Sequence, residues 1–308
     1  MSPSDLGNGS LASQSTYPVI AGVDGSFSAI RAARWAAAVA EKFEAPLQIV
    51  HAKPEIGHNL SDAIAGLRAS EMAAQYESAE AILASAEHAV RGDFKDLRIT
   101  TAQVASPADE ALVDLSRNAR MIVLGSDKVS LGTAILVGST TTAVAAHSIC
   151  PVVAWRGDTT SPTTQPVVLG IDHDDDSRVA ITAAFEFAHR LGLGVIAVHT
   201  WSKRRPAGDV TLPFMIDWDQ FENDERQHLS DSLAPWINTY PGVEVTQVVD
   251  PDKPSRALLR RAKDAQLIVV GSRGRGLLAG ALLGSTGLNL LHHSLIPVMI
   301  CHATDADD

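Results

Sequence analysis

The chain has 308 residues, a formal net charge of −11 at pH 7 and 45% hydrophobic residues. This length is enough for two ordinary domains, each with its own hydrophobic core. The acidic balance argues against nucleic-acid binding as the main activity, because proteins that bind phosphate backbones usually present a basic face. Only two cysteines occur, Cys150 and Cys301, so the sequence contains no disulfide framework and no CxxC pair. We expect both cysteines to be small side chains buried in the core.

The first sixteen residues lack the basic start and the apolar core of a signal peptide. We expect this tail to be disordered. No apolar run in the chain reaches the length needed to cross a membrane. The sequence therefore predicts a cytoplasmic protein with no membrane partner.

The sequence contains a tandem duplication. PVIAGVDGS from Pro18 is matched by PVVLGIDHD from Pro166, an offset of 148 residues, and VLGS from Val123 is matched by VVGS from Val269, an offset of 146. The stretch between the copies is rich in Thr, Ser, Pro and Gly, which is typical of a linker. The predicted parts are the tail at residues 1–16, a first domain at 17–155, a linker at 156–165 and a second domain at 166–303.

Within each copy, apolar runs alternate with helical patterns. In the first copy the expected strands are Val19–Asp24, Leu47–His51, Arg98–Val104, Met121–Gly125 and Pro151–Ala154. The expected helices are Ser28–Glu44, Asp62–Arg91, Pro107–Asn118 and Ser139–His147. Ser28 is expected as the N-cap of the first of these helices, and Pro107 is expected in the first turn of the third. This alternation predicts an α/β fold, a parallel sheet covered by helices on both faces, with ligands at the carboxyl ends of the strands.

A glycine-rich segment follows the fourth strand of the second copy, in the stretch LIVVGSRGRGLLAGALLGST from Leu267 to Thr286. Glycines here allow the backbone N–H groups to surround an anion, and phosphate is the expected one. Two arginines add positive charge, and the next helix opens with a Ser-Thr pair whose N–H groups attract anions. The alternative is that the glycines only form a tight connection between strand and helix.

The spacing Gly-x2-Gly-x9-Gly-Ser, taken with the apolar strands on both sides, resembles the ATP-binding signature of the universal stress protein family. It is not the G-x4-GK[ST] phosphate loop. The resemblance covers Tyr17 to His302. It implies two flavodoxin-like, Rossmann-like doubly wound domains, each with a five-stranded parallel sheet in the order 3-2-1-4-5, and ATP, with Mg²⁺, as the ligand.

The resemblance assigns the more complete nucleotide site to the second copy. Its residues are Gly170, Ile171, Asp172, Val198, Gly271, Ser272, Arg273, Gly274, Arg275, Gly284, Ser285 and Thr286. The site departs from the family after Asp172, where an acidic run replaces Gly-Ser. Those carboxylates would repel a polyphosphate unless a cation bridges them, which makes a magnesium position near Asp174 one interpretation and a solvated acidic loop the other.

In the first copy the implied site consists of Gly22, Val23, Asp24, Val50, Gly125, Ser126, Lys128, Gly138, Ser139 and Thr140. Lys128 replaces the middle glycine of the signature. Its side chain either fills the space that the phosphate loop needs or reaches the phosphates as a cation. We expect weaker or altered binding in this copy, with complete loss of binding as the alternative.

The other candidate groups fit no catalytic motif. His51 and His199 end equivalent strands, where they lie near the ligand or act as hydrogen-bonded structural residues. His292 and His293 point in different directions on a helix and are expected at a solvated helix end. The segment Trp201–Trp218 is expected to form a lid, a partner-binding loop or a covering over the sheet.

The expected function is that of an ATP-binding stress-response regulator with at most slow ATP hydrolysis. The alternatives are an ATP-dependent phosphoryl or adenylyl transferase and a nucleotide-free interaction module. The family resemblance implies pairing through the last strand of each domain, PVVAW or PVMIC, as a homodimer or within the chain. A protein partner of unknown identity is also expected.

Overall fold

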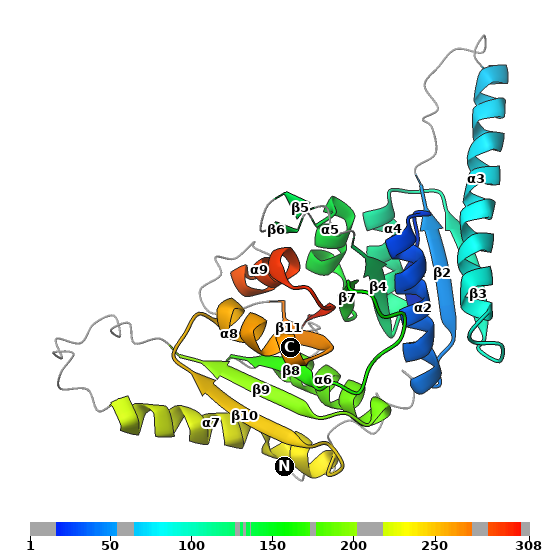
Figure 1. Cartoon of the computed structure of the whole chain (residues 1–308). Helices are drawn as coiled ribbons and strands as arrows, with labels where there is room; N and C mark the ends of the chain where they lie inside the picture. Colours follow the sequence, from blue (N-terminus) through cyan, green and yellow to red (C-terminus); the bar gives the residue numbers. More distant parts are fainter. Residues whose placement is uncertain are drawn as a thin grey trace. The chain divides into compact units, whose positions relative to one another are not determined.

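The computed structural model describes residues 17–53, 65–126, 130–131, 134–135, 137–172, 177–201, 218–272 and 283–302 (Figure 1). The predicted disordered tail lies outside these residues. The chain divides into two compact units, the first ending at Pro162 and the second beginning at Thr163. None of the helices in the described ranges is both long enough and apolar enough to span a bilayer.

Unit 1 contains a five-stranded parallel sheet. Its strands are β1 (Val19–Gly22), β2 (Leu47–Ala52), β3 (Ile99–Val104), β4 (Met121–Gly125) and β7 (Val152–Trp155). They pair in the order β3-β2-β1-β4-β7. A short antiparallel pair, β5 (Ser130–Leu131) and β6 (Ala134–Ile135), lies between β4 and the next helix.

Unit 2 repeats this sheet. Its strands are β8 (Val167–Ile171), β9 (Val195–Thr200), β10 (Val245–Asp250), β11 (Leu267–Gly271) and β12 (Val298–Cys301). They are also parallel and pair in the order β10-β9-β8-β11-β12. In both units the order, counted along the chain, is 3-2-1-4-5, which confirms the predicted fold class.

Helices connect the strands in each unit. Unit 1 has α2 (Phe27–Lys42), α3 (Ala65–Arg91), α4 (Ala108–Leu115), a 3-10 turn η3 (Ser116–Asn118) and α5 (Ser139–His147). Unit 2 has α6 (Ser177–Leu191), α7 (Trp218–Thr239), α8 (Pro254–Arg261), a 3-10 turn η5 (Ala262–Asp264) and α9 (Ser285–His293).

Two glycines show that helices cover both faces of the sheet of unit 1. A Cβ atom on Gly22 would lie 2.5 Å from Leu124 and 3.4 Å from Leu112 of α4. A Cβ atom on Gly125, the residue after Leu124, would lie 2.7 Å from the backbone nitrogen of Ala29 in α2. Since consecutive residues of a strand face opposite sides, α4 and α2 cover opposite faces.

The duplication extends to this packing. In unit 2 a Cβ atom on Gly170 would meet Val270 at 2.9 Å and Leu258 of α8 at 3.0 Å. These three residues are the counterparts of Gly22, Leu124 and Leu112 at the offsets of 148 and 146 found in the sequence. In both units, therefore, the glycine near the end of the first strand leaves space for the equivalent helix, which is α4 in unit 1 and α8 in unit 2.

Two predicted helix starts were wrong. The N-cap of α2 is Ser26, not Ser28, and its Oγ accepts a hydrogen bond from the backbone N–H of Ala29 at 3.2 Å. Ser28 lies inside the helix and is buried. Pro107 is the N-cap of α4 and not a first-turn residue. The predicted strand Val19–Asp24 also ends earlier, at Gly22, because the chain turns away from the sheet after Val23.

The turn between the first helix and the second strand provides a stability prediction. Glu44 has a φ of 54°, a left-handed conformation, and its counterpart in unit 2 is Gly192 with a φ of 68°. We expect Glu44→Gly to raise the free energy of unfolding by about 0.5–1 kcal/mol, because glycine adopts this conformation without steric cost. Urea unfolding of the full chain measures the change.

The matched control is Gly192→Ala, where a Cβ atom would meet nothing within 4 Å. Only the backbone conformation penalises this alanine, so we expect a loss of about 1 kcal/mol. A lower stability of Glu44→Gly would contradict the explanation.

Candidate functional site

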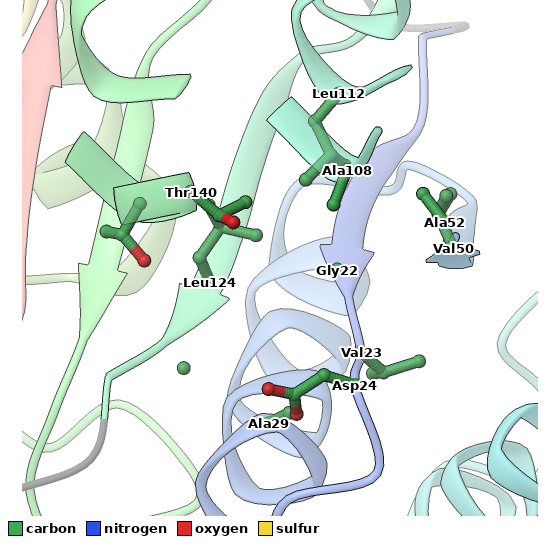
Figure 2. A pocket seen from close by; sticks show the side chains of 12 residues that line it. Gly22, Val23, Asp24, Ala29, Val50, Ala52, Ala108, Leu112, Leu124 and Thr140 are labelled. Atoms are coloured by element: carbon green, nitrogen blue, oxygen red, sulfur yellow. The ribbon is translucent and has the colours of Figure 1, made fainter. Parts of the chain in front are cut away.

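A pocket lies at the carboxyl edge of the sheet in unit 1, where β1, β2 and β4 end (Figure 2). It encloses about 540 Å³ of free space, its open mouth included. Its lining residues are Gly22, Val23, Asp24, Ala29, Val50, Ala52, Ala108, Leu112, Leu124, Gly125, Thr140 and Thr141. Six of the ten residues predicted for the site of the first copy are among them: Gly22, Val23, Asp24, Val50, Gly125 and Thr140.

One wall of the pocket is apolar. Val50 and Ala52 come from β2, and Ala108 and Leu112 come from α4. In Figure 2, Leu112 and Ala108 are drawn above Gly22, on the side away from Asp24, and Val50 and Ala52 lie to the right. Small side chains at three of these four positions leave space for a flat apolar group such as a nucleobase.

The polar side of the pocket begins with Asp24, which lies two residues after the end of β1 and is exposed. Its Oδ1 accepts a hydrogen bond from the backbone N–H of Ser26 at 2.9 Å. Gly25 between them has a φ of 86°, and a Cβ atom there would lie 3.1 Å from Ile82 of α3. The turn thus fixes the carboxylate at the pocket mouth and requires glycine at its centre.

Helix α5 begins at the opposite side of the pocket. Its N-cap is Gly138, which has no side chain to cap the helix, and Thr140 and Thr141 of the first turn line the pocket. Ser126, which follows β4, does not line the pocket, and its buried Oγ has no hydrogen-bond partner among the described residues. The free N–H groups at the start of α5, together with the threonine hydroxyls of its first turn, are suited to an anion.

Unit 2 places the counterparts of these residues at the same edge of its sheet. Gly170 and Ile171 end β8, and Asp172 is the next residue. Gly284 is the N-cap of α9, and its N–H donates to the carbonyl oxygen of Ser272 at 2.7 Å. The remaining described residues of the predicted site are Val198 in β9, Gly271 at the end of β11, and Ser285 and Thr286 at the start of α9.

The first turn after β8 differs from that of unit 1. The Oγ of Ser177 accepts from the N–H of Asp172 at 3.1 Å and donates to its carbonyl oxygen at 3.0 Å. In unit 1 the corresponding turn is held by the Asp24 carboxylate instead. Lys128, Arg273, Gly274, Arg275 and Asp174 lie outside the described residues, so their predicted roles remain predictions.

The two strand-end histidines are hydrogen-bonded inside the structure, which confirms the structural interpretation. His51 Nδ1 lies 2.7 Å from the carbonyl oxygen of Val23, and His199 Nδ1 lies 3.0 Å from that of Ile171. Each histidine thereby fastens the second strand to the backbone just before the site aspartate. His292 and His293 are the last residues of α9, as predicted.

Both cysteines are buried, as predicted. Burial raises the pKa of the Cys150 thiol to about 12, which leaves it protonated and unreactive at neutral pH. Within the described ranges no group of three or more His, Cys, Asp or Glu residues is arranged to hold a metal ion.

Sequence reasoning did not find an aromatic cluster in unit 2. The rings of Trp201 and Trp218 stack with their centroids 5.7 Å apart, and Phe221 lies 5.1 Å from Trp201. The cluster joins the end of β9 to the start of α7. Residues 202–217, for which a lid or covering role was predicted, lie outside the described ranges.

Comparison with known proteins agrees with this architecture. The sequence profile of the Universal stress protein family matches residues 17–156 and 163–302. The chain belongs to the universal stress protein family. A universal stress protein of Mycolicibacterium smegmatis is 33% identical over 94% of this chain and 98% of its own length. One from Mycobacterium tuberculosis is 33% identical over 93% and 96%.

A solved structure shares the two-unit fold. The crystal structure of a universal stress protein from Archaeoglobus fulgidus aligns with a TM-score of 0.67 at 19% identity, covering 94% of this chain and 98% of that one. Family membership therefore agrees with the duplication and with the fold of the two units.

The close contact at Gly125 yields a prediction for this family member. We expect Gly125→Ala to lower the free energy of unfolding by about 1–3 kcal/mol, because its Cβ atom would lie 2.6 Å from the backbone of Ser28. The start of α2 would have to move away from the pocket. Thermal unfolding and the circular dichroism of the full chain measure the effect.

Gly138→Ser is the matched control, because a Cβ atom at Gly138 would meet nothing within 4 Å and serine is a good N-cap. Its stability should equal or exceed that of the wild type. Equal stability of both variants and the wild type would contradict the steric argument.

Proposed function

We propose that the chain is an ATP-binding regulatory protein of the stress response, which acts through partners or self-association and hydrolyses ATP slowly at most. The observation that carries the proposal is the pocket of unit 1. It combines an apolar wall, a fixed carboxylate and the start of a helix at one strand edge. These three parts match the chemistry of a nucleotide, with an aromatic base, a ribose with hydroxyl groups and an anionic phosphate chain.

The apolar wall of Val50, Ala52, Ala108 and Leu112 suits the base. The Asp24 carboxylate, an acceptor at the pocket mouth, suits the ribose hydroxyl groups. The first turn of α5, with Thr140, suits the phosphates. In this assignment Mg²⁺ arrives bound to the phosphates and is not held by a protein cage.

The same assignment extends to unit 2 by the duplication, with Asp172, Val198, Ser272, Ser285 and Thr286 in the corresponding positions. We further propose that the last strands, β7 and β12, mediate pairing, as a homodimer or within the chain. An apolar edge strand is stabilised when another strand covers it.

Calorimetric titration of ATP with magnesium tests the proposal. We expect the wild type to bind ATP and Asp24→Ala to weaken the site of unit 1 by about 10-fold or more, because a hydrogen bond to a charged group contributes about 1.5–3 kcal/mol. Gly274→Glu should remove binding in unit 2, because it places a bulky anion in the glycine loop.

The matched control is Asp93→Ala, which removes an equal charge that pairs with Arg34 at 2.6 Å and does not line the pocket. It should bind ATP as the wild type does. Absence of binding to the wild type would overturn the proposal and favour a nucleotide-free interaction module.

A further inference from the structure

The apolar wall of the pocket in unit 1 includes two residues of β2, Val50 and Ala52. They share one face of the strand, because the residue between them faces the other way. At the offset of 148 residues their counterparts in β9 are Val198 and Thr200. The corresponding wall of unit 2 therefore carries a hydroxyl group at the position where unit 1 has only a methyl group.

The packing of β9 places Thr200 on the face that corresponds to the pocket. Its neighbour His199 faces α7, where Nε2 lies 2.9 Å from Oε2 of Glu225. Thr200 faces the opposite side, which α8 covers, because its register partner Asp250 in β10 bonds Arg260 of α8 at 2.6 Å. Helix α8 is the counterpart of α4, which lines the pocket of unit 1.

Thr200 and Asp250 have hydrogen-bonding capacity that the described residues do not use. Thr200 is half-buried, and its hydroxyl group has no hydrogen-bond partner in the described part of the chain. The side chain of Asp250 is 15% exposed, and Arg260 binds one of its two oxygens, Oδ2. Its Oδ1 accepts no hydrogen bond from any residue that the structure describes. The carboxylate is thus held on the α8 face with one oxygen open to a ligand.

Unit 1 has different chemistry at all three positions. Ala52 pairs in register with Val104, so both strands present apolar side chains there. Asp114 of α4 stands at the position of Arg260, at the offset of 146 residues, and carries the opposite charge. The polar group formed by Thr200, Asp250 and Arg260 is therefore specific to unit 2 and is not a requirement of the duplicated fold.

The polar group favours a ligand that donates hydrogen bonds. A threonine hydroxyl can accept, and an ionised carboxylate can only accept. The exocyclic amino group of a nucleobase has two N–H bonds and can donate to both acceptors. A carbonyl oxygen at the same place on the base would face the carboxylate oxygen and be repelled, and a C–H group would leave both acceptors without a partner.

We propose that Thr200 and Asp250 make the base subsite of unit 2 selective for a base with an amino group, whereas the apolar wall of unit 1 accepts a purine by shape alone. The inference rests on the proposed function, that is, on nucleotide binding at this edge of the sheet. It names the specificity of that site. Adenine nucleotides bind unit 2 in preference to nucleotides of hypoxanthine or of unsubstituted purine.

Titration of the full chain with three nucleoside triphosphates, each with magnesium, tests the selectivity. ATP is compared with inosine triphosphate, which has a carbonyl oxygen in place of the amino group, and with purine riboside triphosphate, which has hydrogen there. The methyl NMR signals of Val198 and Val50, equivalent residues of the two walls, report the occupancy of units 2 and 1 separately.

We expect unit 2 to bind both analogues about five- to twenty-fold more weakly than ATP, because each analogue loses one or two hydrogen bonds. Unit 1 should bind all three nucleotides within about two-fold of one another, because an apolar wall distinguishes them only by shape. Equal affinity of unit 2 for the three nucleotides would overturn the inference.

Two variants separate a hydrogen-bonding role from a structural one. Thr200→Val removes the hydroxyl group and keeps the branched shape, so it should weaken ATP binding in unit 2 about three- to five-fold and leave purine riboside triphosphate unaffected. In Asp250→Asn the amide oxygen stays on Arg260, which only donates, so the amide N–H₂ group replaces Oδ1. This variant should prefer inosine triphosphate to ATP, a reversal that a loss of packing would not produce.

Thr246→Val is the matched control, because Thr246 is an exposed threonine of β10 four residues before Asp250. It should leave the selectivity of unit 2 unchanged. A preference for ATP that survives in both Thr200→Val and Asp250→Asn would also overturn the inference, with the proposed function intact. If neither methyl signal responds to any of the three nucleotides, the proposed function itself fails, so the two failures are distinguishable.

Discussion

The site of unit 1 depends on close packing at the carboxyl ends of the first and fourth strands, β1 and β4. Gly22 and Gly170 admit a leucine of the helix on one face, and Gly125 admits the backbone of α2 on the other. Any side chain at Gly125 would force the start of α2 to move outward, because its Cβ atom would lie 2.6 Å from the backbone of Ser28. The turn after β1 and the start of α5 are brought together because these contacts are short.

The sequence predicts the fold well because the duplication provides each signal twice. The bounds of β4 and α5 were predicted correctly, since β4 is a continuous apolar run and a glycine marks one end of each element. The N-cap of α2 was not predicted correctly. Ser26 and Ser28 are equally good caps by residue type, and the choice is made by the Asp24 turn, which places the Ser26 hydroxyl at the helix start.

The candidate site was predicted in part, for a similar reason. The glycines and Asp24 carry a local pattern that a single sequence reveals. Ala52, Ala108 and Leu112 form the apolar wall only because β2 and α4 meet in space, and small apolar residues are too common to be recognised alone. The pairing of His199 with Glu225 joins a strand to a helix across 26 residues and has no local signature.

The stacked indoles of Trp201 and Trp218 have a consequence for how unit 2 can vary among its relatives. The stacked rings hold the end of β9 against the start of α7, although sixteen residues, 202–217, separate the two in the sequence. Doubling the length of a closed loop costs only about 0.6 kcal/mol of chain entropy. By this estimate, a change in the number of residues between the two tryptophans costs little chain entropy as long as the stacked pair is kept.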